Sequence, residues 1–78
     1  MGTTVGDIRE WLLAAPKDAT HMLVVCDTYD YDDYPSYTDN PSERVEYYKK
    51  ASMQRVMEVY RLSDDHEDQL ALNRVWNV

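Results

Sequence analysis

The feature that most constrains the fold is a short apolar run, MLVVC at residues 22–26. Successive side chains of a strand point to opposite faces, so a strand with this run is apolar on both faces. Such a strand lies inside a sheet and is covered by other elements on both sides. We therefore expect a strand over residues 20–28 at the centre of a small sheet.

A helix is predicted before this run, over residues 4–15. Thr4 can cap its N-terminus, and Asp7 three residues later completes a weak capping box. Pro16 disfavours helical geometry in the residue before it and so ends the helix. Apolar side chains recur at helical spacing and would form one buried stripe with Trp11 at its edge. The stripe residues are Val5, Ile8, Leu12 and Ala15.

Two further elements are predicted after the apolar run. Residues 34–38 fit a short second strand that follows a hairpin-like loop over residues 29–34. Pro35 places this strand at an edge of the sheet, because proline cannot donate to a ladder. Asn40 is a good helix N-cap, Pro41 suits the first helical position, and Glu43 lies three residues after the cap. We expect a helix from Pro41 to about residue 51.

The segment over residues 53–62 fits two interpretations. As a helix, it would place its apolar residues on one stripe and extend the preceding helix to residue 62. As a strand, its Val and Tyr residues have high β propensity, and it would supply a partner for the central strand. We favour the strand.

A last helix is predicted after residue 62, capped by Ser63 or Asp64. Its apolar side would consist of Leu72, Val75 and Trp76. A chain of 78 residues is the length of one domain. Together these elements predict a single α+β domain over residues 1–78, in the order α-β-β-α-β-α, with three helices and a sheet of two or three strands.

Negative charge is concentrated in the stretch over residues 27–40, DTYDYDDYPSYTDN. It holds five Asp, four Tyr and no Lys or Arg, so it contributes −5 of the net charge of −7. The other residues carry eight basic and ten acidic side chains (15 − 5) and are close to neutral. Binding to nucleic acid or to an anionic membrane requires Lys and Arg that neutralise phosphates. The charge therefore argues against both and favours a basic partner.

Clustered carboxylates also suit a divalent-ion site. If Asp30 and Asp32 took positions one and three of an EF-hand loop, Tyr34 would take position five and Pro35 the position of the turn glycine. Because the spacing fails, a solvated acidic loop is the better interpretation, and we predict neither a metal site nor a cofactor. A divalent-ion-binding domain is kept as an alternative.

Nucleophilic catalysis would require an activated Cys26, the only cysteine. His21 is five residues earlier and would lie on the opposite face of the strand. His66 stands among acidic residues, in a setting typical of an exposed helix start. We therefore predict a non-enzymatic protein. A single cysteine also forms no internal disulfide, which is typical of a reducing cytoplasm.

The Tyr and Asp residues of the acidic stretch form the predicted partner-binding surface. Tyr supplies rigid, amphipathic contact area, and Asp supplies charge that steers a basic partner. The predicted contact residues are Asp27, Tyr29, Asp30, Tyr31, Asp32, Asp33, Tyr34 and Tyr37. In an alternative interpretation, the tyrosines pack beneath the loop and the aspartates keep an edge strand from pairing. A homo-oligomer that sequesters a small molecule or a signal nucleotide by stacking on Tyr or Trp76 is a further alternative.

Two segments resemble small accessory proteins of tailed bacteriophages: HMLVVCDTYDYDDYPSY at residues 21–37 and MQRVMEVYRL at residues 53–62. The resemblance continues to DQL at residues 68–70. It implies a phage accessory product, and small acidic phage proteins often block a host enzyme or defence complex, as anti-CRISPR proteins do. The expectation is an anti-CRISPR-like inhibitor that acts in the bacterial host cytoplasm. It would bind a basic surface of a nucleic-acid-handling or defence complex as a nucleic-acid mimic, without contacting nucleic acid or a membrane directly.

Overall fold

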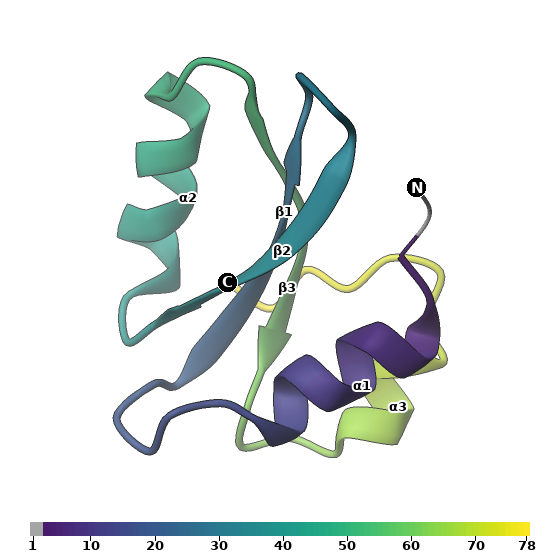
Figure 1. Ribbon diagram of the computed structural model, residues 1–78. Coiled ribbons are helices and arrows are strands. Elements are labelled where there is room, and N and C mark those ends of the chain that lie inside the picture. The colour runs from purple at the N-terminus through teal and green to yellow at the C-terminus, as the bar shows by residue number, and fades with distance from the viewer. Residues whose placement is uncertain (1–2) are drawn as a thin grey trace.

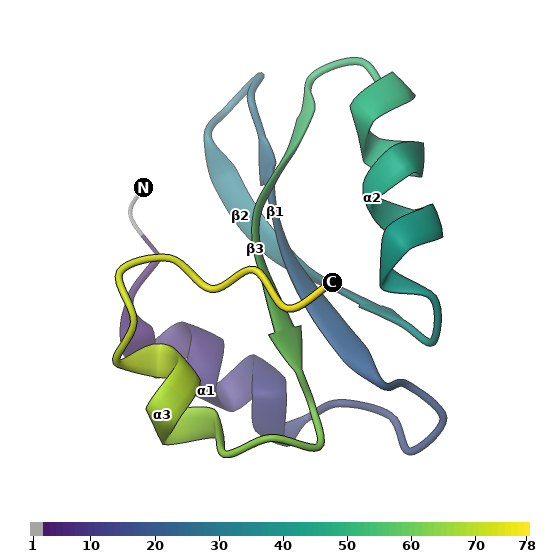
Figure 2. The same ribbon diagram turned by 180° about the vertical axis from the view of Figure 1, so that it is seen from behind.

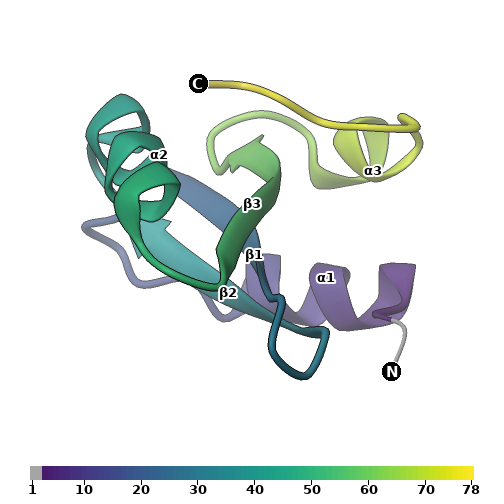
Figure 3. The ribbon, with the colours of Figure 1, turned by 90° about the horizontal axis from the view of Figure 1, so that it is seen from above.

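The computed structural model describes residues 3–78 as a three-stranded antiparallel sheet with helices on both faces. The elements are α1 (Val5–Leu13), β1 (His21–Asp27), β2 (Asp32–Thr38), α2 (Pro41–Lys50), β3 (Gln54–Arg61) and α3 (His66–Leu70). Helix α2 covers one face of the sheet, and α1 and α3 lie together on the other face (Figures 1 and 3). The order of the elements confirms the predicted α+β fold, with three strands.

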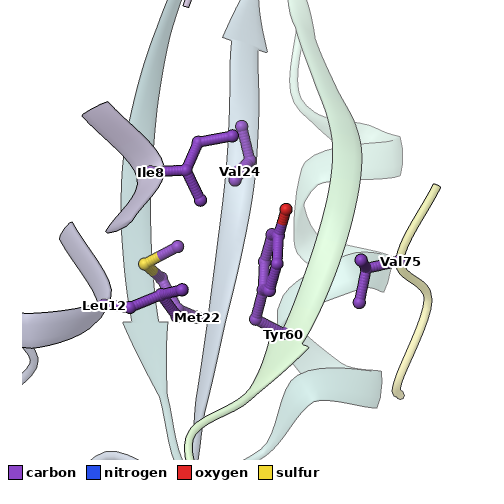
Figure 4. Close-up of a cluster of buried hydrophobic side chains, with 6 residues drawn as sticks. All are labelled: Ile8, Leu12, Met22, Val24, Tyr60 and Val75. Carbon is purple, nitrogen blue, oxygen red and sulfur yellow. The ribbon is translucent and has the colours of Figure 1, made fainter. Parts of the chain in front are cut away.

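Strand β1 is the centre of the sheet, whose strand order is β2-β1-β3. Its residues Met22 and Val24 face α1, and Leu23 and Val25 face α2. All four are at most 2% exposed. Figure 4 shows the cluster on the α1 side, where side chains from α1, β1, β3 and the C-terminal segment meet. The central strand covered on both faces is therefore confirmed.

Residues 54–61 form strand β3, so the strand interpretation is confirmed and the single long helix is wrong. The pairing of β3 with β1 is interrupted by a bulge. Glu58 lies opposite Val24. Val56 lies opposite Val25, which leaves Met57 as the extra residue. Strand β2 lies at the other edge of the sheet, as its proline requires.

Helix α1 has the predicted capping box between Thr4 and Asp7. It buries Ile8 and Leu12 but ends at residue 13, so residue 15 of the predicted stripe lies outside it. Val5 is exposed rather than buried, because the first turn of α1 extends past the sheet (Figure 3).

The last helix differs from its prediction. Its N-cap is Asp65, whose side chain accepts a hydrogen bond from Asp68 N at 3.0 Å, and not Ser63 or Asp64. A side-chain oxygen at this position can reach the free N–H groups of the first turn, and the two earlier residues stand outside that turn. The helix ends at Leu70, so Leu72, Val75 and Trp76 all lie outside it.

Leu72 lies in the turn after α3, whereas Val75 and Trp76 lie in an extended segment beside β3. Val59 N donates to Val75 O at 2.9 Å, and Asn77 N donates to Val59 O at 3.0 Å. Val75 is fully buried, whereas Trp76 is exposed. The open edge of β3 offers backbone donors and acceptors, so it holds the segment as a strand-like neighbour instead of a helix.

Candidate functional site

The acidic stretch folds into the β1–β2 hairpin. Strand β2 begins two residues earlier than predicted, so the connecting turn spans residues 28–31. Tyr29 N donates to Asp27 Oδ1 at 2.9 Å. Asp32 N donates to Asp30 Oδ1 at 3.1 Å, and Tyr31 N donates to the backbone oxygen of Asp27 at 2.7 Å. Aspartate favours turns because its side chain makes such bonds, so the acidic residues themselves close this turn.

A second turn, residues 51–53 between α2 and β3, lies at the same end of the sheet (Figure 1). Thr28 N donates to Met53 O at 2.9 Å and so joins the two turns. Tyr31 and Met53 both have a φ of 60°, in the left-handed region that favours glycine. The exposed fractions are 77% for Tyr29, 68% for Tyr31 and 55% for Met53. We define the tip surface as Tyr29, Asp30, Tyr31, Asp32 and Met53.

The eight predicted contact residues differ in how far they are exposed to solvent. Four of them are exposed on the tip surface: Tyr29, Asp30, Tyr31 and Asp32. Asp27 and Asp33 are half-buried at the strand ends that lead into the turn. Neighbouring residues of a strand point to opposite faces, so Asp33 projects away from Asp32.

Tyr34 and Tyr37 also lie on opposite faces of β2. Tyr34 packs under α2, with its ring edge-on to Tyr48 at 6.5 Å between ring centroids, and its hydroxyl donates to the side-chain oxygen of Gln54. Tyr37 packs on the α1 side, and its hydroxyl donates to Trp11 O at 2.6 Å. These two tyrosines are packed inside the fold, as the alternative interpretation expects, but they pack against helices α2 and α1 and not beneath the hairpin loop.

Burial changes the acidity of the packed tyrosines. Burial and the neighbouring Tyr48 hydroxyl raise the pKa of Tyr34 to about 12. Burial also raises the pKa of Tyr37. Burial and the Glu58 carboxylate raise the pKa of Tyr60.

The free energy of unfolding is expected to fall as the pH rises above about 10. Unfolded tyrosines ionise near pH 10, whereas Tyr34, Tyr37 and Tyr60 hold their protons to higher pH in the fold. The stability contributed by the neutral hydroxyls is complete below that pH and is lost as the pH rises through the folded pKa values. Urea unfolding between about pH 8 and about pH 12 measures the slope. The Tyr34→Phe variant should have a smaller slope, and an unchanged slope would contradict this account.

The tip surface carries negative charge without a cationic partner in residues 3–78. The ion pairs in this part of the chain are Arg9–Glu67, Glu46–Lys49 and Arg61–Asp64, all outside the hairpin. Asp27 and Asp32 lie directly opposite each other in the β1–β2 pair, where like charges destabilise a sheet. The hairpin therefore ends in uncompensated negative charge.

Cys26 lies in surroundings that favour the neutral thiol. Burial and the neighbouring Asp33 carboxylate raise the pKa of its thiol, which lowers its reactivity at neutral pH. His21 lies on the other face of β1, as expected from the spacing. Within residues 3–78, no three His, Cys, Asp or Glu side chains are arranged to hold a metal ion. No helix in the same residues is long and apolar enough to cross a bilayer.

Met53 is a member of the tip surface that the sequence pattern did not indicate. Its place depends on where the α2–β3 turn meets the hairpin, and no local pattern reports such a contact. No family model matches the chain, and neither the curated proteins nor the solved structures give a match.

Proposed function

We propose that this chain is a non-enzymatic protein-binding module that contacts its partner through the tip surface. The observation that carries this proposal is the high exposure of Tyr29 and Tyr31 on a turn closed by hydrogen bonds. Tyrosine is enriched among the residues that dominate binding energy, because it offers a large amphipathic area with few rotatable bonds. A turn already held in one conformation also loses little entropy on binding.

The charge of the tip surface indicates the chemistry of the partner. Asp30 and Asp32 flank Tyr31, and no cation within residues 3–78 neutralises them. A basic protein surface would supply the missing cations. Complementary charges speed association and are screened by salt, with a Debye length of about 8 Å at physiological ionic strength. We therefore infer a basic partner that is recognised in a salt-sensitive way.

The resemblance to phage accessory proteins supports a narrower form of this proposal. A groove that holds nucleic-acid phosphates is a basic surface, and the carboxylates of Asp30 and Asp32 would occupy the places of phosphates there. The partner would then be a bacterial host complex that handles nucleic acid or acts in defence. The chain would inhibit this complex in the host cytoplasm.

Changing Asp30, Asp32 and Asp33 to Asn should greatly reduce capture of the partner from a bacterial lysate. Asparagine keeps the side-chain oxygen that accepts the turn hydrogen bond from Asp32 N, so three charges are removed while the turn is retained. Loss of the repulsion between Asp27 and Asp32 should leave the variant at least as stable as the wild type. The measurement is the amount of partner captured from the lysate on the immobilised protein, at low and at physiological salt. Mass spectrometry identifies and quantifies the captured protein.

The matched control changes three exposed carboxylates outside the hairpin to amides: Glu10, Asp18 and Asp68. Both triple variants have the same net charge, so only the position of the lost charge differs. A basic protein should be captured by the wild type and by the control, more weakly as salt increases, and should be lost with the hairpin variant. Equal capture by the two triple variants would overturn the proposal.

A further inference from the structure

A recess of about 320 Å³ lies between α2, β3 and the C-terminal segment. Figure 2 shows that this segment crosses β3 and ends on the side of α2. The lining residues are Val45, Tyr48, Lys49, Gln54, Arg55, Val56, Arg74 and Trp76. None of them belongs to the tip surface, so the recess is a separate candidate site.

The recess is cationic although the chain is acidic. Lys49, Arg55 and Arg74 are three of the eight basic residues, and the lining contains no Asp or Glu. Lys49 pairs with Glu46 at 3.3 Å, whereas Arg55 and Arg74 form no ion pair within residues 3–78. Salt screens charges beyond about 8 Å. Arg55 lies opposite Cys26, on the face of the sheet away from α2, where it lines a second recess with Asp33 and Glu58. Lys49 and Arg74 are therefore the cations nearest to a ligand on the α2 side, which responds to them more than to the net charge of −7.

One wall of the recess is an indole ring beside a guanidinium group. Trp76 is 44% exposed, and the guanidinium carbon of Arg74 lies 5.1 Å from the centroid of its ring. Arg74 Nε donates to Met57 O at 3.3 Å, which anchors the side chain and leaves its other N–H groups for an anion. The exposed part of the indole is open to stacking by a planar ring.

The floor of the recess is apolar. Tyr48 and Val45 belong to the buried cluster between α2 and the sheet, and Val56 packs against that cluster. Ligand sites typically combine an apolar lining with a few polar groups, at volumes of about 300–1,000 Å³. The recess thus matches a small ligand that has a flat ring at one end and an anion at the other.

We propose that the recess binds a nucleoside monophosphate or a closely related ring-bearing phosphate. The base stacks on Trp76, and the phosphate lies beside Arg74 and Lys49, since a guanidinium group binds phosphate oxygens with paired hydrogen bonds and an ammonium group adds a point charge. Inorganic phosphate lacks the ring that fits the apolar floor. A longer nucleic-acid strand brings many phosphates to a recess with only three cations.

An NMR titration of the full chain with adenosine monophosphate, adenosine and inorganic phosphate tests the proposal. Adenosine monophosphate should shift the Trp76 indole signal and bind with a Kd below about 1 mM. Adenosine and inorganic phosphate should each bind at least about tenfold more weakly, because each lacks one of the two contacts. No binding of adenosine monophosphate up to about 10 mM, or equal affinity for inorganic phosphate, would overturn it.

Substitutions inside and outside the recess test whether adenosine monophosphate binds there. Lys49→Gln and Arg74→Gln should each weaken the binding of adenosine monophosphate about tenfold or more. Lys17→Gln removes the same charge from an exposed position outside the recess and should leave the affinity unchanged. The triple Asn variant of the hairpin should also bind normally, so this result is independent of the partner-binding proposal. Equal losses in Arg74→Gln and Lys17→Gln would show a general charge effect and would overturn the assignment of the recess.

Discussion

Replacing Gln69 with leucine is expected to lower the free energy of unfolding by about 2–4 kcal/mol. Gln69 is 4% exposed, and its amide pairs with Arg61 as a neighbouring strand would. Arg61 N donates to Gln69 Oε1 at 2.8 Å, and Gln69 Nε2 donates to Arg61 O at 2.9 Å. The same amide accepts from Asn77 Nδ2 at 2.8 Å and donates to Asp65 O at 3.2 Å. Leucine has a similar volume but leaves these donors and acceptors without partners.

This loss is large for a chain of this length. The total stability expected on the usual per-residue scale is roughly 4–12 kcal/mol, so the urea midpoint should shift clearly. Asn77→Ala is a graded control, because it removes one of the four bonds and should cost about 0.5–1.5 kcal/mol. If Gln69→Leu is no less stable than Asn77→Ala, the amide of Gln69 does not have the role assigned to it.

A Gln69→Glu variant separates hydrogen-bond donation from packing. Glutamate keeps the shape and the acceptor oxygens but lacks the N–H groups that reach Arg61 O and Asp65 O. Burial raises the pKa of such a carboxyl group. Relative to the wild type, the variant should therefore be most stable below about pH 4.3 and should lose stability as the pH rises through the folded pKa. Gln69→Leu should show no such dependence.

The order of the elements was predictable because its causes are local. The apolar run at residues 22–26 has no polar face, so it requires cover on both sides. Pro35 restricts its strand to an edge of the sheet. The pair Asn40 and Pro41 predicts a helix that begins at Pro41, and α2 begins there. Each of these effects acts within a few residues of the chain, which is the range that sequence patterns report.

The C-terminal segment was not predictable in this way. The spacing of Leu72, Val75 and Trp76 fits a helix, but the backbone bonds that hold the segment come from β3. The Gln69 amide also binds the backbone of β3, at a separation of eight residues, and the residue type alone does not distinguish it from a surface glutamine. The recess was missed for the same reason, because its three cations come from α2, β3 and the C-terminal segment.

The candidate site was partly predictable. Composition and charge pointed to the hairpin, and four of its predicted residues are exposed on the tip surface. Tyr34 and Tyr37 turned inward because helices cover both faces of the sheet, so side chains on either face of β2 meet a helix. Composition cannot separate a contact tyrosine from a packing tyrosine, since both need a large side chain with one polar atom.

Replacing Tyr31 with asparagine is expected to change stability and partner binding in opposite directions. Tyr31 has a φ of 60°, a conformation that costs a non-glycine residue about 1–2 kcal/mol and that asparagine adopts more readily. Its side chain is mostly exposed, so its loss removes little packing. The free energy of unfolding, measured in urea, should therefore be unchanged or higher by up to about 1 kcal/mol.

Capture of the partner by the same variant should fall about tenfold or more, because loss of a dominant contact residue costs about 2 kcal/mol or more. Tyr47→Asn is the matched control, since Tyr47 is an exposed tyrosine of α2 outside the tip surface. Equal capture by the two variants would show that Tyr31 does not contact the partner. Loss of both stability and capture would show instead that Tyr31 serves the fold. Higher stability with weaker capture is the result expected where a strained, exposed residue is kept for recognition.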